Sequence, residues 1–512
     1  MIGSVTDKAA SWVGRMRRTI VSIAALAASL LLMMVAGPAW ADTFTVTNTN
    51  DSGAGSLGAA ITEANANTGA DEITFADGVG GTITLASTLP TVTDPEGLTI
   101  DGGQSASVTI SGRDHVGVFE VEAGAELALL NLTVADGSVA GNGGGLLNDG
   151  TLTVTNSTFS ENSADGLGGG GIFNSPSGTL TVTNSTFSQN INFGFNNFGG
   201  GIFNSPGGTL TVTNSTFSEN ITDGFGGGIF NSLSGTLTVT NSTFSNNNAD
   251  GAGGGIFNEG QSTATLRNTI VANSISGGNC AGDAITDGGY NIDDGTSCGF
   301  STTDNSLSDV APMLGPLADN GGPTLTHALL EGSPAINAIP EGTNGCGTTI
   351  TTDQRGVTRP QGSGCDIGAF ETQAPTANDD PTTAGDPKYS VDQDGSLTLS
   401  ASDGVLANDT DPDDNPLTAL KVTDPTNGTL TLSPDGSFTY TPRAGFSGID
   451  SFTYKANDGT NDSNVATVTL TVNPETTAPT VSSVTPTKTT GVSRTPIITA
   501  TFSEPVDKAT VE

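Results

Sequence analysis

Positive charge is scarce in this chain of 512 residues, which has 15 Lys and Arg against 53 Asp and Glu and a formal net charge of −38. Four basic residues and one acidic residue precede Asp42, so 11 basic residues face 52 acidic ones from there onward. Such a chain repels the phosphates of nucleic acid and of anionic lipid. We therefore expect neither nucleic acid nor an anionic membrane surface among its partners.

Side chains suited to catalysis are also few, with two His, four Cys and only 13% charged residues. A lyase of acidic polysaccharides needs a basic side chain that removes the proton beside the uronate. The Lys and Arg residues between positions 42 and 373 are Arg113, Arg267, Arg355 and Arg359. Arg113 stands beside Asp114 and His115, and we interpret this triplet as a turn. The 71 glycines favour a turn-rich β protein instead.

The sequence has one long apolar run, at positions 20–35. This run lies within residues 1–41, which we interpret as a secretory signal. Basic residues precede this run and Ala39-Trp40-Ala41 supplies a small-residue cleavage site. A membrane anchor is the alternative, but the run is short and ends in Gly37-Pro38. We expect a secreted or cell-surface protein, with no membrane insertion after cleavage of the signal.

The abundant feature is a repeat within residues 129–274. TLTVTNSTFSEN and its close variants begin at Thr151, Thr179, Thr209 and Thr236, and each copy leads through a glycine run into Ile-Phe-Asn. The repeated Asn falls at 131, 156, 184, 214, 241 and 268, in steps of 25–30 residues. A period of this length without a helical pattern predicts a solenoid.

The pattern inside each copy predicts the parallel β-helix form of solenoid. Leu, Val and Phe of L-T-V-T-N-S-T-F point inward on successive strands, Thr points outward, and coils stack at about 4.8 Å. The repeated Asn fits a bend, where its side chain can bond the coils above and below. The same Asn matches the N-glycosylation pattern, but we favour the structural role.

Residues 42–128 predict an N-terminal cap and the first coils. Ser56 can cap a helix from Leu57 to Ala64 whose apolar face covers the end of the solenoid. Short strands are predicted at 72–75, 82–85, 98–101, 108–111, 118–121 and 127–134.

A hydrolase site needs two carboxylates at a set separation, and the coils contain two candidate pairs. Glu161 and Glu219 share a repeat position two coils apart, with Gln189 between them. Asp223 and Asp250 lie in adjacent coils, about 5–6 Å apart. Both precede Gly, which is a turn signal, so we predict no catalytic residues and leave weak calcium binding there open. Phe193, Phe195 and Phe198 form either a contact loop or a cover folded over the coil.

Residues 265–371 end the repeat and contain the four cysteines. Four cysteines allow three connectivities, of which Cys280 with Cys298 and Cys346 with Cys365 is the simplest. Export favours disulfides over a metal site. His327 has no Cys or His nearby and is expected to be structural.

Residues 372–387 are a linker, and the alternation in residues 388–473 predicts a β-sandwich. Short carboxylates crowd one of its loops, and calcium takes 6–8 oxygen ligands. We predict a calcium site at Asp409, Asp411, Asp413 and Asp414, which the carboxylates of Asp379, Asp380 and Asp458 could approach.

Several segments resemble known families. GSLGAAITEANANTGADEITF resembles the CSLREA domain of exported bacterial repeat proteins, and GGGIFN with FSEN is similar to the repeats of polymorphic outer membrane proteins. RNTIVANS, ADNGGPTLTHALLEGSPAIN and TDQRGVTRPQGSGCDIGAFE resemble the choice-of-anchor Q domain. GVLANDTDPDDNPLTA and NGTLTLSPDGSFTYTPRAGFSGIDSFTYKANDG resemble cadherin-like (tandem-95, VCBS-like) modules. FSEPVD, within residues 474–512, resembles part of a bacterial Ig-like domain, so we expect the natural chain to continue to further modules and an anchor.

The expected architecture is all-β: a right-handed parallel β-helix, a cadherin/Ig-like β-sandwich and a truncated Ig-like domain. The resemblances imply a structural or adhesive surface protein with a calcium-stiffened spacer, whose partners are cell-surface glycans or surface proteins. The alternative is a polysaccharide-binding or polysaccharide-degrading β-helix enzyme, either a lyase or a glycoside hydrolase.

Overall fold

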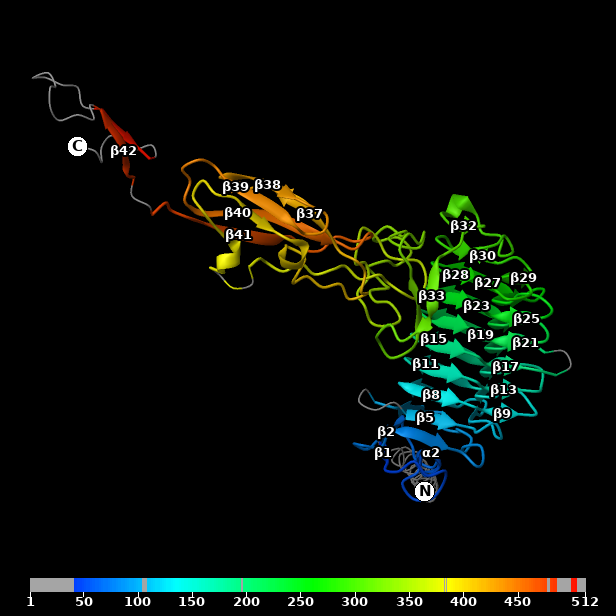
Figure 1. The fold of residues 1–512 in the computed structure, drawn as a ribbon. Coiled ribbons are helices and arrows are strands. Elements are labelled where there is room, and N and C mark those ends of the chain that lie inside the picture. The colour runs from blue at the N-terminus through cyan, green and yellow to red at the C-terminus, as the bar shows by residue number, and fades with distance from the viewer. Residues whose placement is uncertain are drawn as a thin grey trace, which may run out of the picture. The chain divides into compact units, whose positions relative to one another are not determined.

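Coils of short parallel strands make up most of the first of two structural units (Figure 1). The computed structural model describes residues 41–103, 108–194, 197–381, 383, 385–476, 479–485 and 499–503. The predicted signal therefore lies outside the described residues except for its last position. The first unit ends at Thr372 and the second begins at Gln373, and each is described by itself.

Each coil contributes one strand to each of two long parallel sheets, A and B. Sheet A contains β1 (Thr43–Val46), β2 (Asp71–Phe75), β4 (Leu98–Asp101), β7 (Glu126–Leu130), β11 (Thr151–Thr155), β15 (Thr179–Thr183), β19 (Thr209–Thr213), β23 (Thr236–Thr240), β27 (Thr263–Arg267) and β30 (Thr286–Asp287). Sheet B contains β3 (Gly81–Thr84), β5 (Val108–Ser111), β8 (Leu132–Ala135), β12 (Thr158–Ser160), β16 (Thr186–Ser188), β20 (Thr216–Ser218), β24 (Thr243–Ser245), β28 (Ile270–Ala272), β31 (Ile292–Asp293) and β32 (Leu307–Ser308).

Two shorter parallel sheets, C and D, complete the coils. Sheet C contains β6 (Phe119–Val121), β10 (Leu146–Asn148), β14 (Ile172–Asn174), β18 (Ile202–Asn204), β22 (Ile229–Asn231), β26 (Ile256–Asn258) and β29 (Cys280–Gly282). Sheet D contains β9 (Ser138–Val139), β13 (Ser163–Ala164), β17 (Ile191–Asn192), β21 (Ile221–Thr222) and β25 (Asn248–Ala249). Identical repeat positions pair in register, as in Leu152 with Leu180 and Phe159 with Phe187.

The interior consists of the predicted apolar ladders. Leu180, Val182 and Phe187 are fully buried, and the phenylalanine ladder stacks with ring centroids 4.6–5.0 Å apart. Because each inward side chain lies against the same residue type in the next coil, the same packing arrangement is repeated in every coil.

Two rows of buried asparagines run beside these ladders, and the sequence analysis did not predict them. Asn148, Asn174, Asn204, Asn231 and Asn258 each link to the next amide at 2.7–2.9 Å. A second row joins Asn162, Asn190, Asn220 and Asn247 at 2.9 Å. These amides form hydrogen bonds with one another and with nearby backbone groups, so the linked atoms have partners although they are buried.

The predicted bend asparagines are confirmed in conformation and only partly in bonding. Asn156, Asn184 and Asn214 have φ near 50°, a left-handed value that Asn tolerates well. Asn156 donates to Asn131, but Asn214 donates instead to the Thr352 carbonyl oxygen at 3.0 Å. The row is therefore not a continuous ladder.

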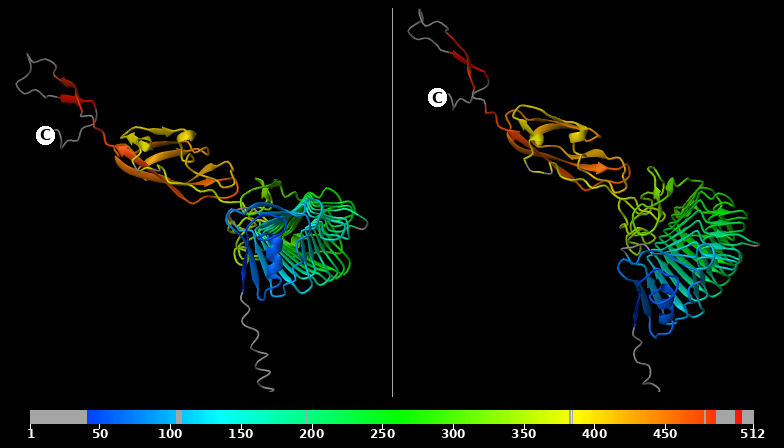
Figure 2. Two further views of the ribbon diagram at one scale, coloured as in Figure 1. Left: turned by 90° about the horizontal axis from the view of Figure 1, so that it is seen from below. Right: turned by 60° about the horizontal axis from the view of Figure 1, so that its bottom comes forward.

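The N-terminal end of the stack is covered by helix α2 (Leu57–Ala64), as predicted (Figure 2). The Ser56 side chain accepts a hydrogen bond from the Ala59 amide, which caps the helix. Leu57, Ile61 and Ala64 are fully buried and continue the solenoid core. The helix thus supplies the apolar cover that an open solenoid end lacks.

The other end passes through η1 (Thr302–Asp304) into a segment, residues 314–372, that we call the tail. It contains the antiparallel pair β33 (Leu314–Ala318) and β34 (Thr326–Leu329) and lies along sheet B. Disulfides join Cys280 to Cys298 and Cys346 to Cys365, the local pairing expected from the sequence. Each one closes an irregular loop near the end of the stack.

The second unit is a β-sandwich. One sheet contains β35 (Ser390–Asp392), β41 (Ala466–Asn473), β40 (Gly448–Asn457) and β37 (Thr418–Thr423); the other contains β36 (Leu397–Leu399), β39 (Phe438–Pro442) and β38 (Gly428–Leu432). The short 3-10 turn η2 (Pro387–Tyr389) precedes β35, and η3 (Ala401–Asp403) follows β36. Tyr440, Phe452 and Tyr454 fill the core.

The predicted Ig-like segment is described only in part. Strands β42 (Val481–Thr485) and β43 (Thr499–Phe502) pair antiparallel, and the segment containing Glu504-Pro505-Val506 lies outside the described residues. Among the described residues no helix is long and apolar enough to cross a membrane.

Candidate binding surfaces

The tail covers half of the outward face of sheet B. The Thr186 hydroxyl donates to the Leu325 carbonyl oxygen at 2.6 Å, and the Thr243 hydroxyl accepts from the Ala369 amide at 3.0 Å. These threonines are buried, whereas Thr133 and Thr158, at the matching positions of β8 and β12, are half-buried. We call β5, β8 and β12 the open half of sheet B and β16, β20 and β24 the covered half.

Gln354 is the central contact of the covered half. Its side-chain oxygen accepts from the Thr216 hydroxyl at 2.7 Å, and its amide nitrogen donates to the hydroxyls of Thr186 and Thr324 at 2.8 and 2.9 Å. One buried amide therefore bridges two adjacent coils and the tail itself.

His327 joins the tail to the same face. Its Nδ1 lies 2.8 Å from the Gly315 carbonyl oxygen and its Nε2 lies 3.0 Å from the Ser218 hydroxyl oxygen. Because a carbonyl only accepts, Nδ1 carries the proton and Nε2 accepts from Ser218. Burial lowers the pKa of His327, against the raising effects of the Gly315 bond and of Glu219. The structural role expected from the sequence fits this neutral, doubly bonded ring.

A buried ionic network fixes the end of the tail. Arg359 donates to Glu371 at 2.7 Å and to the carbonyl oxygens of Asp366 and Gly368. Arg355 pairs with Asp353 at 2.9 Å and lies over the Phe370 ring at 3.6 Å. Burial raises the pKa of Asp366 to about 6, and burial followed by the Asp366 carboxylate raises the pKa of Glu371 to about 8. Both arginines are thus committed to structure.

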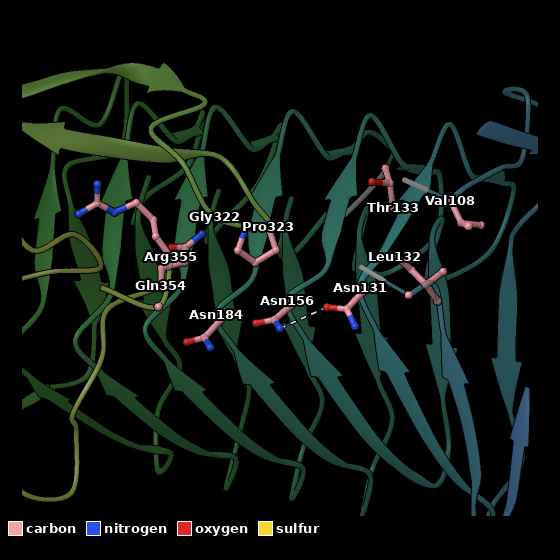
Figure 3. Close-up of a pocket in the computed structure, with 12 residues that line it drawn as sticks. Val108, Asn131, Leu132, Thr133, Asn156, Asn184, Gly322, Pro323, Gln354 and Arg355 are labelled. Carbon is pink, nitrogen blue, oxygen red and sulfur yellow. Dashed lines mark hydrogen bonds between the residues drawn. The ribbon is translucent and has the colours of Figure 1, made fainter. Parts of the chain in front are cut away.

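A polar cleft of about 560 Å³ lies where the tail stops covering sheet B (Figure 3). Its floor carries the bend amides of Asn131, Asn156 and Asn184, one in each successive coil, and its wall includes Pro323 and Gln354. Asn156 donates to Asn131 at 3.2 Å. The Asn184 Oδ1 atom is buried and has no hydrogen-bond partner among the described residues.

A second groove of about 840 Å³ contains the glutamates considered for hydrolysis. Glu161, Gln189 and Glu219 line it together with Ile191 and Ile221. The Gln189 side chain donates to Glu219 at 3.0 Å. Glu161 and Glu219 are two coils apart, a backbone separation of about 10 Å. That exceeds the 5–5.5 Å of retaining glycosidases and lies at the upper limit for inverting ones.

The other candidate catalytic residues lie in exposed turns, and of these Asp114 lines the same groove as Glu161 and Glu219. Arg113 and Asp114 both have φ of 56°, and the Asp114 amide donates to the Asp136 carbonyl oxygen. Asp223 and Asp250 are exposed at equivalent places in adjacent coils and line neither the cleft nor the groove.

An aromatic stripe follows the outward face of sheet C. Phe173, Phe203 and Phe230 stack with ring centroids 5.0 and 5.4 Å apart and are nearly buried. Phe198 folds over Phe230, with ring centroids 4.4 Å apart, which is the covering role considered from the sequence. Phe193 remains 42% exposed, and Phe195 lies outside the described residues.

The predicted calcium residues have separate partners in the second unit. Asp409 accepts from the Asn378 amide at 2.8 Å and from the Tyr454 hydroxyl, and Asp413 accepts from the Gln373 amide at 2.6 Å. Asp414 is exposed and has φ of 58°. In the part of the chain that the structure describes, no three His, Cys, Asp or Glu side chains form a group that could hold a metal ion.

Asp411 lies instead near Asp458. Burial raises the pKa of Asp411, and the carboxylates of Asp458 and Asp413 raise it further. The Oδ2 atoms of Asp411 and Asp458 are buried without a hydrogen-bond partner among the described residues, and Asp458 is 4% exposed. With the Oδ1 atom of Asn408, these two oxygens are the unsatisfied buried acceptors of the Asp-rich loop region among the described residues.

Two segments match known families in comparisons of the sequence. Residues 96–297 match the right-handed β-helix region, which agrees with the hand predicted for the solenoid, and residues 378–474 match the bacterial cadherin-like domain. A search of curated proteins finds no match. The chain therefore contains a right-handed β-helix region followed by a bacterial cadherin-like domain.

Proposed function

We propose that this protein is an exported structural and adhesive protein of the cell surface, which acts by contact rather than by catalysis. The observation that carries the proposal is the combination of a uniform β-helix with a cadherin-like domain in one strongly acidic, disulfide-bonded chain. Disulfides persist in oxidising compartments outside the cytosol, which supports export.

The uniformity of the coils supports contact over chemistry. A catalytic site concentrates a few unlike side chains with perturbed pKa values in one pocket. The outward faces of these coils instead repeat the same Thr, Asn and Phe positions. The buried ion pairs of Arg355 and Arg359 stabilise the tail.

We include calcium in the proposal, as a stiffening ion of the cadherin-like domain. Asp411 and Asp458 would hold it through their unpartnered Oδ2 atoms, with amide, backbone and water oxygens completing the 6–8 ligands that calcium takes. A bound cation would offset the repulsion between these carboxylates. It would thereby order the loops at that end of the domain.

The calcium test uses the full chain with and without the ion. We expect calcium to raise the melting temperature of the second unit, since a ligand at 100 times its Kd stabilises by about 2.7 kcal/mol. Asp411→Asn with Asp458→Asn should remove the shift, whereas Asp435→Asn, in an exposed turn, should retain it. A shift that survives the double substitution would place the ion elsewhere.

Adhesion is tested with the full chain coated on beads and mixed with cells, with and without calcium. We expect retention of cells and no release of product from acidic or neutral polysaccharides. Product formation without cell retention would reverse the assignment.

The second candidate function is that of a glycoside hydrolase, favoured by the groove that contains Glu161 and Glu219. If it is correct, Glu161→Gln or Glu219→Gln should abolish release of reducing sugar. Asp149→Asn, outside the groove, should have no effect on that release.

A further inference from the structure

We propose that the polar cleft at the edge of the tail is a binding site for an uncharged oligosaccharide. This inference rests on the proposed contact function and names the ligand class of one surface. The bends that lead into β8, β12 and β16 supply the floor of the cleft and the tail supplies its wall (Figure 3).

The floor presents carboxamides at regular intervals. Asn131, Asn156 and Asn184 occupy the same bend in consecutive coils, so their backbone positions repeat at about 4.8 Å along the axis. A carboxamide both donates and accepts hydrogen bonds, and so does a sugar hydroxyl. A row of amides therefore matches a chain of hydroxyl-bearing rings better than it matches an apolar or singly charged ligand.

Asn184 gives the most specific indication of a ligand. Its Oδ1 atom is buried without a donor among the described residues, as is that of Asn214 at the next bend outside the cleft, whereas Asn131 and Asn156 are linked to each other. A buried acceptor without a partner is unfavourable, and a hydroxyl placed in the cleft would supply the missing donor.

The charge of the lining argues against an ionic ligand. Arg355 is the charged side chain that lines the cleft, and its guanidinium already binds Asp353, the Glu371 carbonyl oxygen and the Phe370 ring. At the other end the Asn131 amide donates to Asp101, a carboxylate that repels anions. The net charge of −38 acts in the same direction against acidic polysaccharides.

The size and the partly apolar lining fit a short stretch of sugar. The volume of about 560 Å³ lies within the range of small-ligand sites. Pro323, which is exposed, adds apolar surface for the C–H face of a ring. The site needs no movement of the tail to admit a ligand.

The test measures binding of cellohexaose, mannohexaose and chitohexaose to the full chain by calorimetry, with an oligogalacturonate hexamer as the acidic comparison. Asn184→Gly and Asn156→Gly keep the left-handed bend and remove the amide. Each should weaken the Kd of the bound hexamer about tenfold, the loss of roughly one hydrogen bond. Asn241→Gly, at the same bend with φ of 49° but outside the cleft, is the matched control and should leave the Kd unchanged.

The proposal is overturned if none of the uncharged hexamers binds, if the acidic hexamer binds more tightly, or if the control weakens binding as much as the cleft variants. Circular dichroism and the melting temperature of each variant separate loss of the site from loss of the fold. The cell-bead assay separates this inference from the contact function. Beads that retain cells while no hexamer binds would remove the cleft proposal and leave the adhesive function standing.

Discussion

The two halves of sheet B share a sequence repeat and have different surfaces. Thr158 on β12 is half-buried, whereas Thr216, at the same place in the repeat on β20, is fully buried. The backbone and the inward phenylalanine, Phe159 or Phe217, are the same in these two coils, so the difference comes from Gln354, which binds Thr216 from 138 residues later in the chain. The repeat therefore determines the coil, and a distant segment determines which coils remain available for contact.

The largest expected effect comes from detaching the tail. Arg359→Met leaves the buried carboxylate of Glu371 and the carbonyl oxygens of Asp366 and Gly368 without their guanidinium donor, and breaking a buried pair costs about 3–5 kcal/mol. We expect hydrogen exchange in residues 352–372 to accelerate strongly and the covered half of sheet B to acquire the accessibility of the open half.

The matched control for that change is Lys421→Met in the second unit, which breaks an exposed pair with Asp424 and should cost at most about 1 kcal/mol. If exchange in residues 352–372 is unchanged in Arg359→Met, the ionic network does not hold the tail on sheet B.

Substitutions in the buried asparagine rows should lower the free energy of unfolding equally in the two halves, because these rows belong to the coils and not to the tail. Asn162→Ala and Asn220→Ala each break the same pattern, in which the amide donates to the next Asn in the row and to a backbone carbonyl oxygen. We expect each to lower the free energy of unfolding by about 2–3 kcal/mol, through unpaired buried groups. Urea denaturation followed by circular dichroism measures both, and a difference above 1 kcal/mol between them would show that the interior is not equivalent.

The outward threonines should respond unequally. Thr216→Val leaves the buried Gln354 oxygen without its donor and should cost about 1–2 kcal/mol. Thr158→Val, on the open half, should change the free energy of unfolding by less than about 0.5 kcal/mol, as surface substitutions do. Equal costs would mean that the tail contributes little to the stability of the face it covers.

Most of the features that the sequence could predict belong to the coil and not to the segment that covers it. The inward ladder, the helix from Leu57 to Ala64 with its Ser56 cap and strands β4 and β5 all follow from local periodicity and turn residues, and the structure has them at the predicted positions. The buried asparagine rows were missed because Asn in a strand is expected to face solvent, and only stacking of identical residues makes its burial favourable.

Contacts between distant segments left no local pattern to detect. The bond between Thr186 and Leu325 joins residues 139 apart, and Thr186 has the same residue type as its uncovered equivalents Thr133 and Thr158. In the second unit, the sequence predicted that Asp458 could approach the acidic loop, and the structure has it near Asp411. Which of the loop's carboxylates Asp458 approaches required the fold.

The smallest expected effect is a pH dependence confined to the covered half. Burial lowers the pKa of His327, so the docked tail holds the neutral ring, whereas a released tail would return the pKa toward the ordinary value of about 6.5. The released state then binds more protons below pH 6.5, and stability that is complete above pH 6.5 falls as the pH drops toward the lowered value, by up to about 1.4 kcal/mol per pH unit.

Protons taken up by Asp366 and Glu371, whose pKa values are raised, act in the opposite direction, so the contribution of His327 is isolated by comparing His327→Gln with the unsubstituted chain. We expect the protection factors of β34, which are corrected for intrinsic amide exchange at each pH, to fall between pH 7.5 and 5.5 more in the unsubstituted chain than in His327→Gln, while those of β8 on the open half change equally in both. Because β8 has no tail above it, an equal response of β8 and β34 to the substitution would trace the pH effect to the coil instead of to the segment that covers it.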